Sequence, residues 1–342
     1  MSGSTTHPAS PSRGRHLSRA LTALALAAVT STGLAACGSD DEPAAGGGGG
    51  QSSSSAAIVK NDANASKTLK LGSKNFTEQQ VLGEVYAQAL EAKGYKIQRD
   101  FSIGSEKIAL KALEDKQIDA YPEYTGTALT NFFDVPSDEI PKDSTQAYDL
   151  MKDKFETEKQ ITALPPTPFT NSNAVGVTEA LAKKDNLVNI SDLSKVAGDL
   201  TLSGSPECRS RIDCLKGLEG TYGLKFKKYV PVDVALRHEV LTTGKADISI
   251  LFGTDPQIAR DKFVVLKDDK KLFPPYNVSM LARDDVIDEA GPDFAKTIDL
   301  VNTKLDAKVI QELNAKVDLD KETPEAAAKS YLTQFGFVES GS

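Results

Sequence analysis

The sequence has no tryptophan, three histidines and three cysteines, and these shortages exclude several kinds of chemistry. His7 and His16 lie near the N-terminus, so His238 is the only histidine in the rest of the chain. No His-Glu-x-x-His pattern, Gly-x-Ser-x-Gly elbow or Walker-type Gly-x-x-x-x-Gly-Lys-Ser/Thr loop occurs. The sequence therefore indicates neither a zinc protease, nor an elbow-type serine hydrolase, nor an ATPase. A pair of carboxylates acting as acid and base stays open, although no pair stands out.

Basic residues are scarce relative to acidic ones. Lys and Arg total 40 against 48 Asp and Glu, a net charge of -8. The first 36 residues hold three arginines and no acidic residue, so a chain beginning at Cys37 has 37 basic against 48 acidic residues, a net charge of -11. Nucleic-acid binding depends on a basic footprint, and no stripe of Lys and Arg interleaved with aromatics is present. We therefore expect no nucleic acid as a partner.

The apolar stretch at residues 21–29 has the setting of an export signal. Three arginines precede it, and small residues follow it up to Leu34-Ala35-Ala36-Cys37. The stretch is too short to span a bilayer stably. Its end resembles the bacterial lipobox, in which the cysteine becomes the first mature residue and carries lipid. An ordinary secretory signal with a nearby cysteine is the alternative. We expect residues 1–36 to be a signal peptide and Cys37 to be lipidated.

Glycine and serine dominate the segment after Cys37, with five glycines at 46–50 and four serines at 52–55. Such a segment has no apolar surface to bury and is typical of a flexible tether. The sequence predicts a tether over residues 37–67. Lipid and tether together would hold the folded part near the outer face of the cytoplasmic membrane.

The two remaining cysteines lie close together in Cys208-Arg-Ser-Arg-Ile-Asp-Cys214. No second cysteine pair or nearby histidine completes a zinc site, so the ligand count argues against a structural metal. In the oxidising compartment that an export signal implies, a disulfide closing a short loop is the better interpretation. Two unrelated thiols are the alternative. We expect a disulfide between Cys208 and Cys214, and neither a metal nor a cofactor.

From Thr68 onward the sequence alternates short apolar strands with amphipathic helices, which is typical of α/β sheets that bind ligands at the carboxyl ends of their strands. Strands are predicted at 69–71, 97–101, 118–121 (ended by Pro122), 174–178, 200–203, 246–252 and 263–266. Helices are predicted at 81–90 (ended by Gly94), 106–114, around 191–193, at 232–242 and over most of 292–337. Thr77-Glu-Gln-Gln80 and Thr254-Asp-Pro-Gln257 are both typical of capping boxes.

Six collinear motifs carry a family resemblance across residues 69–337. They are Leu71-Gly-Ser-Lys-Asn-Phe-Thr-Glu-Gln-Gln80, Gly104-Ser-Glu106, Asp119-Ala-Tyr-Pro-Glu-Tyr-Thr-Gly-Thr127, Leu215-Lys-Gly-Leu-Glu-Gly-Thr-Tyr-Gly223, Gly253-Thr-Asp255 and Leu266-Lys-Asp-Asp-Lys-Lys-Leu-Phe-Pro-Pro-Tyr276. Together they resemble the ProX-like (OpuAC-type) osmoprotectant-binding proteins, the substrate-binding subunits of ABC importers for glycine betaine, choline and carnitine.

The resemblance implies an α/β, two-lobed type II periplasmic-binding-protein fold with a ligand cleft between the lobes. Lobe one would comprise residues 68–170 plus 277–342, and lobe two residues 171–276. The chain would cross between the lobes near 169–173 and again near 276–279.

The resemblance also implies a binding site with an aromatic cage. Family members place cage tyrosines at the positions of Tyr124 and Tyr276. Aromatic faces suit a trimethylammonium group because it has no conventional N–H to donate and is attracted by the ring electrons. The third and fourth tyrosines of the cage align near Thr167 or Phe169 and near His238, so this chain departs from the full cage.

Polar residues complete the expected site. A helix start with free N–H groups suits a carboxylate, and Lys74, Asn75 and Thr77 stand at one. Glu106 lies where some relatives carry a small polar residue and would balance a substrate cation. Capping alone is the alternative explanation for Thr77, Thr254 and Asp255. The full expected set of ligand-binding residues is Lys74, Asn75, Thr77, Glu106, Tyr124, Thr125, His238, Thr254, Asp255 and Tyr276.

The sequence therefore predicts a monomeric, non-enzymatic, extracytoplasmic solute-binding subunit of an ABC importer. It would capture glycine betaine, choline or a related quaternary-ammonium osmoprotectant and deliver it to a permease served by a separate ATPase subunit. The departures from the cage make a larger betaine such as ergothioneine the first alternative. An enzyme on the same scaffold and a structural or adhesive surface lipoprotein are the alternatives from other classes, and both would leave the cleft motifs without a role.

Overall fold

A computed structural model of the chain describes residues 57–339. The expected signal peptide, the lipidated Cys37 and the Gly- and Ser-rich part of the tether lie outside the described residues. Residues 57–67, which the sequence assigns to the tether, are folded against the first lobe. The Ile58 amide donates to the Phe337 carbonyl at 2.9 Å, and the Lys67 ammonium donates to the Ala290 carbonyl at 2.8 Å. The tether prediction is therefore wrong for these residues, because their polar groups have partners far along the chain.

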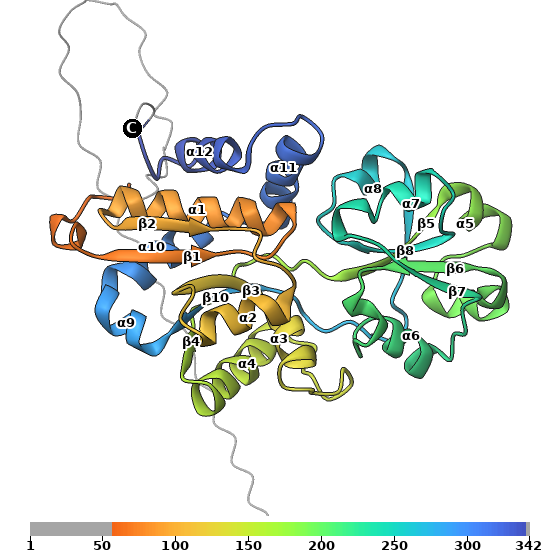
Figure 1. Cartoon of the computed structure of the whole chain (residues 1–342). Coiled ribbons are helices and arrows are strands. Elements are labelled where there is room, and N and C mark those ends of the chain that lie inside the picture. Colours follow the sequence, from red (N-terminus) through yellow and green to blue (C-terminus); the bar gives the residue numbers. More distant parts are fainter. Residues whose placement is uncertain (1–56, 340–342) are drawn as a thin grey trace, which may run out of the picture. The chain divides into compact units, whose positions relative to one another are not determined.

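Two five-stranded sheets organise the described residues, and both have the same layout (Figure 1). The first has the order β2-β1-β3-β10-β4 and consists of β1 Thr68–Gly72, β2 Lys96–Asp100, β3 Ala120–Tyr124, β4 Ile161–Ala163 and β10 Val278–Arg283. The second has the order β7-β6-β8-β5-β9 and consists of β5 Asn173–Thr178, β6 Thr201–Gly204, β7 Lys228–Pro231, β8 Ile248–Phe252 and β9 Phe263–Leu266. In each sheet three adjacent strands are parallel, and the fourth strand, β10 or β5, is antiparallel to both neighbours.

Helices pack on both faces of each sheet (Figure 1). The apolar side chains between helices and sheets are buried in four cores. One core of the first sheet includes α1 Thr77–Lys93, α9 Asp284–Ala290, α10 Pro292–Asn302, α11 Ala307–Asp318 and α12 Pro324–Gln334. The core on its other face includes α2 Glu106–Glu114, α3 Thr125–Asn131 and α4 Ser144–Glu158. The second sheet packs α5 Glu179–Asp185 and α6 Leu215–Tyr222 in a larger core, and α7 Glu239–Thr242 and α8 Gln257–Arg260 in a smaller one. The protein thus has the two α/β lobes that the sequence predicts.

The chain crosses between the lobes twice, and the two crossings lie side by side. The first crossing runs from β4 into β5, and the second from β9 into β10. They are joined by an isolated bridge between Thr170 and Asn277, and the Asn171 amide donates to the Tyr276 carbonyl at 3.0 Å. Each antiparallel strand is therefore the first strand that the chain forms after it enters a lobe.

Most predicted elements are present, but both predicted capping boxes are wrong. Helix α1 has Phe76 as its N-cap without a side-chain cap, and it ends at Gly94, whose φ of 107° favours glycine. The Thr77 hydroxyl donates instead to Asp318 of α11 at 2.6 Å. Helix α8 begins only at Gln257, with Pro256 as its N-cap. The threonine side chains that would cap these helices form hydrogen bonds with residues far along the chain instead.

Two further predictions fail for different reasons. Strand β3 continues through Pro122 to Tyr124. This is tolerated because β1 pairs with β3 only at Ala120, so the missing N–H of Pro122 interrupts no further pairing with β1. The helix predicted at 232–242 is not continuous, since it is broken into a short 3-10 helix at Val234–Leu236 and the four residues of α7. Among the described residues no helix is long and apolar enough to cross a membrane.

The disulfide between Cys208 and Cys214 is confirmed, and the loop that it closes packs tightly on the second lobe. The loop lies directly against α6, since a Cβ added to Gly217 would lie 2.2 Å from the Ile212 carbonyl oxygen. Gly204 of β6 leaves room for the sulfur, because a Cβ there would lie 3.0 Å from the Cys208 Sγ. Because glycine has no side chain, both positions leave room for the disulfide loop.

The contact at Gly217 yields a paired prediction. A Gly217→Ala change forces the methyl against the loop backbone, and overpacking of this kind costs about 1–3 kcal/mol in the free energy of unfolding. Gly220 lies one turn away in the same helix with nothing within 4 Å of its added Cβ. Gly220→Ala should therefore raise the free energy of unfolding by roughly 0.5–1 kcal/mol through helix propensity. Denaturant unfolding of both variants checks this, and equal effects of the two changes would contradict the packing assigned to Gly217.

A second prediction concerns the disulfide itself. Opening a short loop restores entropy to the unfolded chain and should lower the free energy of unfolding by about 2 kcal/mol. Thermal unfolding of the purified protein with and without a phosphine reductant measures the difference. The Cys208→Ser/Cys214→Ser double variant is the control, and its melting temperature should not respond to the reductant. If the reductant lowered the melting temperature of the double variant by the same amount, the disulfide would not be the cause of the change.

Candidate ligand-binding cleft

A cavity of about 370 Å³ lies between the lobes, and its walls come from the carboxyl ends of the parallel strands. On lobe one the walls follow β1 (Lys74 to Phe76), β2 (Ser105 and Glu106) and β3 (Tyr124 and Thr127). On lobe two they follow β6 (Ser205 to Arg211), β7 (Asp233 to Arg237) and β8 (Phe252). The two crossings contribute Asn171, Asn173 and Tyr276. The repeated sheet layout thus brings six strand ends to one cavity, the place where α/β sheets bind ligands.

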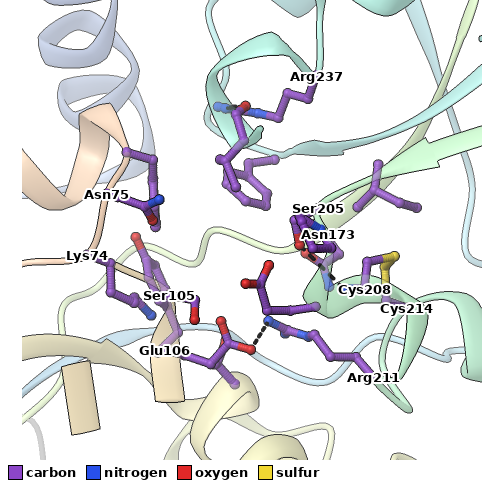
Figure 2. A pocket seen from close by; sticks show the side chains of 18 of the residues that line it. Lys74, Asn75, Ser105, Glu106, Asn173, Ser205, Cys208, Arg211, Cys214 and Arg237 are labelled. Atoms are coloured by element: carbon purple, nitrogen blue, oxygen red, sulfur yellow. Dashed lines mark hydrogen bonds and ion pairs between the residues drawn. A yellow bond between two sulfur atoms is a disulfide. The ribbon is translucent and has the colours of Figure 1, made fainter. Parts of the chain in front are cut away.

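Half of the residues predicted from the sequence line this cavity. They are Lys74, Asn75, Glu106, Tyr124 and Tyr276. Figure 2 shows Lys74, Asn75 and Glu106 on one side of the cavity, facing Ser205, Asn173 and Arg211 on the other.

The other predicted residues do not line the cavity, because their side chains are engaged behind its walls. They are Thr77, Thr125, His238, Thr254 and Asp255. The Thr125 hydroxyl donates to the Pro275 carbonyl at 2.8 Å. His238 Nε2 lies 2.8 Å from Asp255. Burial opposes ionisation of Asp255, but the charge of Arg237 and the bonds from both partners outweigh it and lower the pKa of Asp255 to about 2. These side chains support the walls rather than face the cavity.

Glu78 is a heavily hydrogen-bonded group beside the cavity. Its fully buried carboxylate accepts four hydrogen bonds from neutral donors, which are the Tyr124 hydroxyl at 2.8 Å, the Asn171 amide at 2.8 Å, the Thr254 hydroxyl at 2.5 Å and the Asn314 amide at 3.0 Å. Burial raises the pKa of Glu78, and these four bonds oppose the rise. Because Thr254 belongs to lobe two and Glu78 to lobe one, the carboxylate joins the lobes. Its bond from the Tyr124 hydroxyl also orients the Tyr124 ring.

Arg211 faces the cavity from the disulfide loop. Its guanidinium donates two hydrogen bonds to the buried Asp213, at 2.8 and 2.6 Å, and Asp213 also accepts from the Tyr276 hydroxyl at 2.6 Å. Burial opposes ionisation of Asp213, but the Arg211 charge and these bonds lower its pKa. The third guanidinium nitrogen, Nη1, lies 3.3 Å from Oε1 of Glu106 in the other lobe. Arg211 is thus held by its own lobe and reaches across the cavity.

Aromatic rings and cations alternate along the cavity wall. The Lys74 ammonium lies 4.5 Å from the centre of the Tyr124 ring and is paired with the buried Glu123. On lobe two the Arg237 guanidinium lies 4.5 Å from the centre of the Phe252 ring and forms a two-bond pair with Asp255.

Phe76 extends the aromatic surface across the cleft. Its ring stacks on Tyr124 with centroids 6.2 Å apart and meets Phe252 of the other lobe at 5.3 Å. Ring faces of this kind attract positive charge.

Several residues of the cavity and its surroundings were not predicted from the sequence. Arg211 lies between the two cysteines, and that segment suggests only a disulfide, although the Arg-x-Asp pattern in the loop after β6 is a signal that could have indicated a polar wall residue. Phe76 lines the cavity and Glu78 lies behind its wall, and both belong to the motif from which the expected site takes only Lys74, Asn75 and Thr77. Asn171 and Asn173, rather than Thr167 or Phe169, line the cavity from the first crossing, because Thr167 and Phe169 are buried in lobe one. No group of acidic, His and Cys side chains suited to a metal occurs among residues 57–339.

Comparison with known proteins agrees with this architecture. Residues 67–334 match the family model described as the substrate binding domain of ABC-type glycine betaine transport systems. The glycine-betaine-binding protein of Pseudomonas aeruginosa is 31% identical over 81% of this chain and 90% of its own length. The ergothioneine transport permease/ergothioneine binding protein EgtU of Helicobacter pylori is 28% identical over 82% of this chain and 50% of its own length.

A solved structure gives the same result at the level of the fold. The crystal structure of a glycine betaine/carnitine/choline ABC transporter protein covers 79% of this chain and 99% of its own, with a TM-score of 0.63 and 27% identity. The family consists of transporter binding proteins rather than enzymes. With two like-built lobes, a cleft at their strand ends and a family match over most of its length, this chain belongs to the substrate-binding domains of ABC-type glycine betaine transport systems.

Proposed function

We propose that the cleft captures glycine betaine, choline or a related quaternary-ammonium solute outside the cytoplasm and that the closed protein delivers it to an ABC permease. The observation that carries the proposal is the cavity at the six strand ends, where Tyr124, Phe76 and Tyr276 supply aromatic surface. Such surface binds a trimethylammonium group by cation–π attraction and by burial of its methyl groups. The ligand-binding residues of this proposal are Lys74, Asn75, Phe76, Glu106, Tyr124, Arg211 and Tyr276.

The internal cations indicate where the ligand would lie. Lys74 already covers one face of Tyr124, and Arg237 covers one face of Phe252. The ligand methyl groups would therefore lie against Phe76, Tyr276 and the remaining face of Tyr124. Burial raises the pKa of the Tyr276 hydroxyl well above its usual value, so the phenol stays neutral and adds no repelling or attracting charge of its own.

Capture would proceed by closure of the lobes about the two crossings. The proposed lobes are residues 68–170 with 277–342, and residues 171–276. We include 57–67 in the first lobe because Ile58 and Lys67 form hydrogen bonds with it. The Glu78 bond to Thr254, the Gln257 bond to Asp318 and the ring contact of Phe76 with Phe252 join the lobes on one side of the cavity. A ligand that touches both walls stabilises this arrangement by its differential affinity for the closed state.

A larger betaine such as ergothioneine is a second candidate ligand. The cavity of about 370 Å³ falls in the range of sites for drug-sized molecules, and the relative from Helicobacter pylori is named for ergothioneine. Asn75, Asn171 and Asn173 would supply hydrogen bonds to the additional polar groups of such a ligand.

We also propose that lipid on Cys37 tethers a monomeric protein to the outer face of the cytoplasmic membrane. Mass spectrometry of the mature N-terminus tests this.

Calorimetric titration tests the ligand class. Glycine betaine, choline, carnitine and ergothioneine form the panel, with glycine and proline as controls that lack a quaternary nitrogen. We expect saturable binding of at least one quaternary ammonium compound. Tyr124→Ala should weaken it about tenfold or more, because it removes the ring and the donor to Glu78. Tyr95→Phe, which removes a buried hydroxyl bond to Ala290 far from the cavity, should leave affinity unchanged. Binding of a control amino acid alone would overturn the proposal.

The contribution of the lobe contact is tested separately. Thr254→Val keeps the side-chain shape but removes the hydroxyl bond to Glu78, a bond that is broken when the lobes part. We expect ligand affinity to fall about tenfold, because the lost hydrogen bond destabilises only the closed state. Small-angle scattering with saturating ligand should then show a more open mean structure. Thr297→Val removes a comparable buried hydroxyl within lobe one and is the control. Equal affinities of the two variants would show that this contact does not assist closure.

A further inference from the structure

The disulfide loop supplies much of the lobe-two wall. The residues of the loop that line the cavity are Ser205, Pro206, Glu207, Cys208, Arg211 and Cys214. Both cysteines are therefore wall residues themselves, and Figure 2 shows their disulfide beside Arg211. Only 3% of Cys208 and 2% of Cys214 is exposed, so a solute that fills the cavity would cover the disulfide almost completely.

The backbone bonds within this loop are weak. The loop runs from the end of β6 to the start of α6 and includes a three-residue 3-10 helix at Glu207–Arg209. The amides of Arg209, Arg211 and Cys214 donate to carbonyls of the same loop at 3.4, 3.4 and 3.3 Å, which is longer than usual for such bonds. The covalent link between Cys208 and Cys214 therefore supplies rigidity that these bonds do not.

Asp213 connects the disulfide to both crossings between the lobes. It directly precedes Cys214 in the chain. Its carbonyl accepts from the Asn173 side chain, at the start of β5, at 3.0 Å, and its carboxylate accepts from the Tyr276 hydroxyl at 2.6 Å. The same carboxylate holds the Arg211 guanidinium by two bonds. A shift of the loop would therefore move Arg211 and remove the partner that orients the Tyr276 ring.

We propose that the disulfide positions the lobe-two wall for binding, so that the oxidised protein binds its solute more tightly than the reduced protein. The inference rests on the proposed function, in which Arg211 and Tyr276 contact the solute. Reduction by a dithiol breaks the S–S bond and leaves two protein thiols, which have gained two electrons and two protons, while the dithiol becomes a cyclic disulfide. The loosened loop must then be ordered when the solute binds, and this cost weakens binding.

Binding and oxidation must be coupled in both directions. If oxidation tightens binding tenfold, saturation with the solute favours the oxidised form tenfold by the same free energy. For a two-electron couple, a tenfold change corresponds to about 30 mV in the reduction potential. A disulfide that served only the stability of lobe two would show no such coupling, because the solute would not distinguish its two states.

Calorimetric titration of the full protein with glycine betaine, choline, carnitine and ergothioneine, before and after reduction by dithiothreitol, tests the inference. Affinity for the compound that binds should fall about tenfold on reduction. The Cys208→Ser/Cys214→Ser variant should bind as weakly as the reduced protein, and the reductant should not change its affinity. Val177→Ala is the control, because it opens a cavity in the core of lobe two near the far end of β5. It should leave the affinity within about twofold.

A second measurement follows the disulfide instead of the solute. The protein is equilibrated in buffers of reduced and oxidised dithiothreitol, free thiols are alkylated, and mass spectrometry gives the fraction reduced. A saturating concentration of the compound that binds should lower the reduction potential of the disulfide by about 30 mV.

The outcomes separate this inference from the proposed function. Equal affinities of the oxidised protein, the reduced protein and the double variant, or a reduction potential that the solute does not change, would overturn the positioning role and leave the proposed function standing. An equal loss of affinity in Val177→Ala would assign the effect to the stability of lobe two and would also overturn that role. Absence of binding of all four compounds to the folded, oxidised protein would overturn the proposed function and this inference with it.

Discussion

Glu78 places a carboxylate where the start of α1, the end of β3, the first crossing, the loop before α8 and helix α11 all meet. An unsatisfied buried carboxylate is costly, so the segments that supply its donors must keep their relative positions. The same four bonds set the orientation of the Tyr124 ring and the distance between the lobes on that side of the cavity. Because no cation is among its partners, the arrangement relies on hydrogen-bond geometry, which is more directional than an ion pair.

Paired charges give the cavity wall its rigidity. A cation that is held by its own carboxylate in two bonds cannot reorient freely, and this applies to Arg211 and Arg237. Each pair belongs to a single lobe, so the walls remain organised whether the lobes are together or apart. A wall organised before binding lowers the ordering cost of capture. The contact between Glu106 and Arg211 differs because it spans the lobes.

Repetition of one sheet layout explains why the site lies where it does. Three parallel strands in each lobe direct their carboxyl ends to the same side, and the crossing strands β5 and β10 join the lobes at that side. Loops at these ends are free of sheet pairing, so they can carry polar and aromatic residues without loss of core packing. The cleft therefore follows from topology, and its chemistry from the few loop residues after each strand.

Local patterns account for what could be predicted. Helix α2 and strand β9 have the bounds that periodicity predicts, and Gly94 ends α1 as expected, because these depend on neighbouring residues. The disulfide was predictable for the same reason, since its cysteines are close in sequence. The capping boxes failed because the hydroxyls of Thr77 and Thr254 donate to carboxylates in other segments, those of Asp318 and Glu78. Strand β3 passed through Pro122 because its pairing with β1 had already ended.

The sequence by itself determined the family, most of the strands and the presence of Tyr124 and Tyr276 at a strand end and a crossing, but it did not predict β4, β7 or β10. Only the tertiary structure decided which polar side chains face the cavity. The four donors to Glu78 lie 46, 93, 176 and 236 residues away along the chain, and no local pattern encodes such distances. Arg211 and Glu106 likewise come from different lobes. A side chain's partner depends on which segments fold together, because the energy of a buried polar group is set by its surroundings in space and not by its neighbours in sequence.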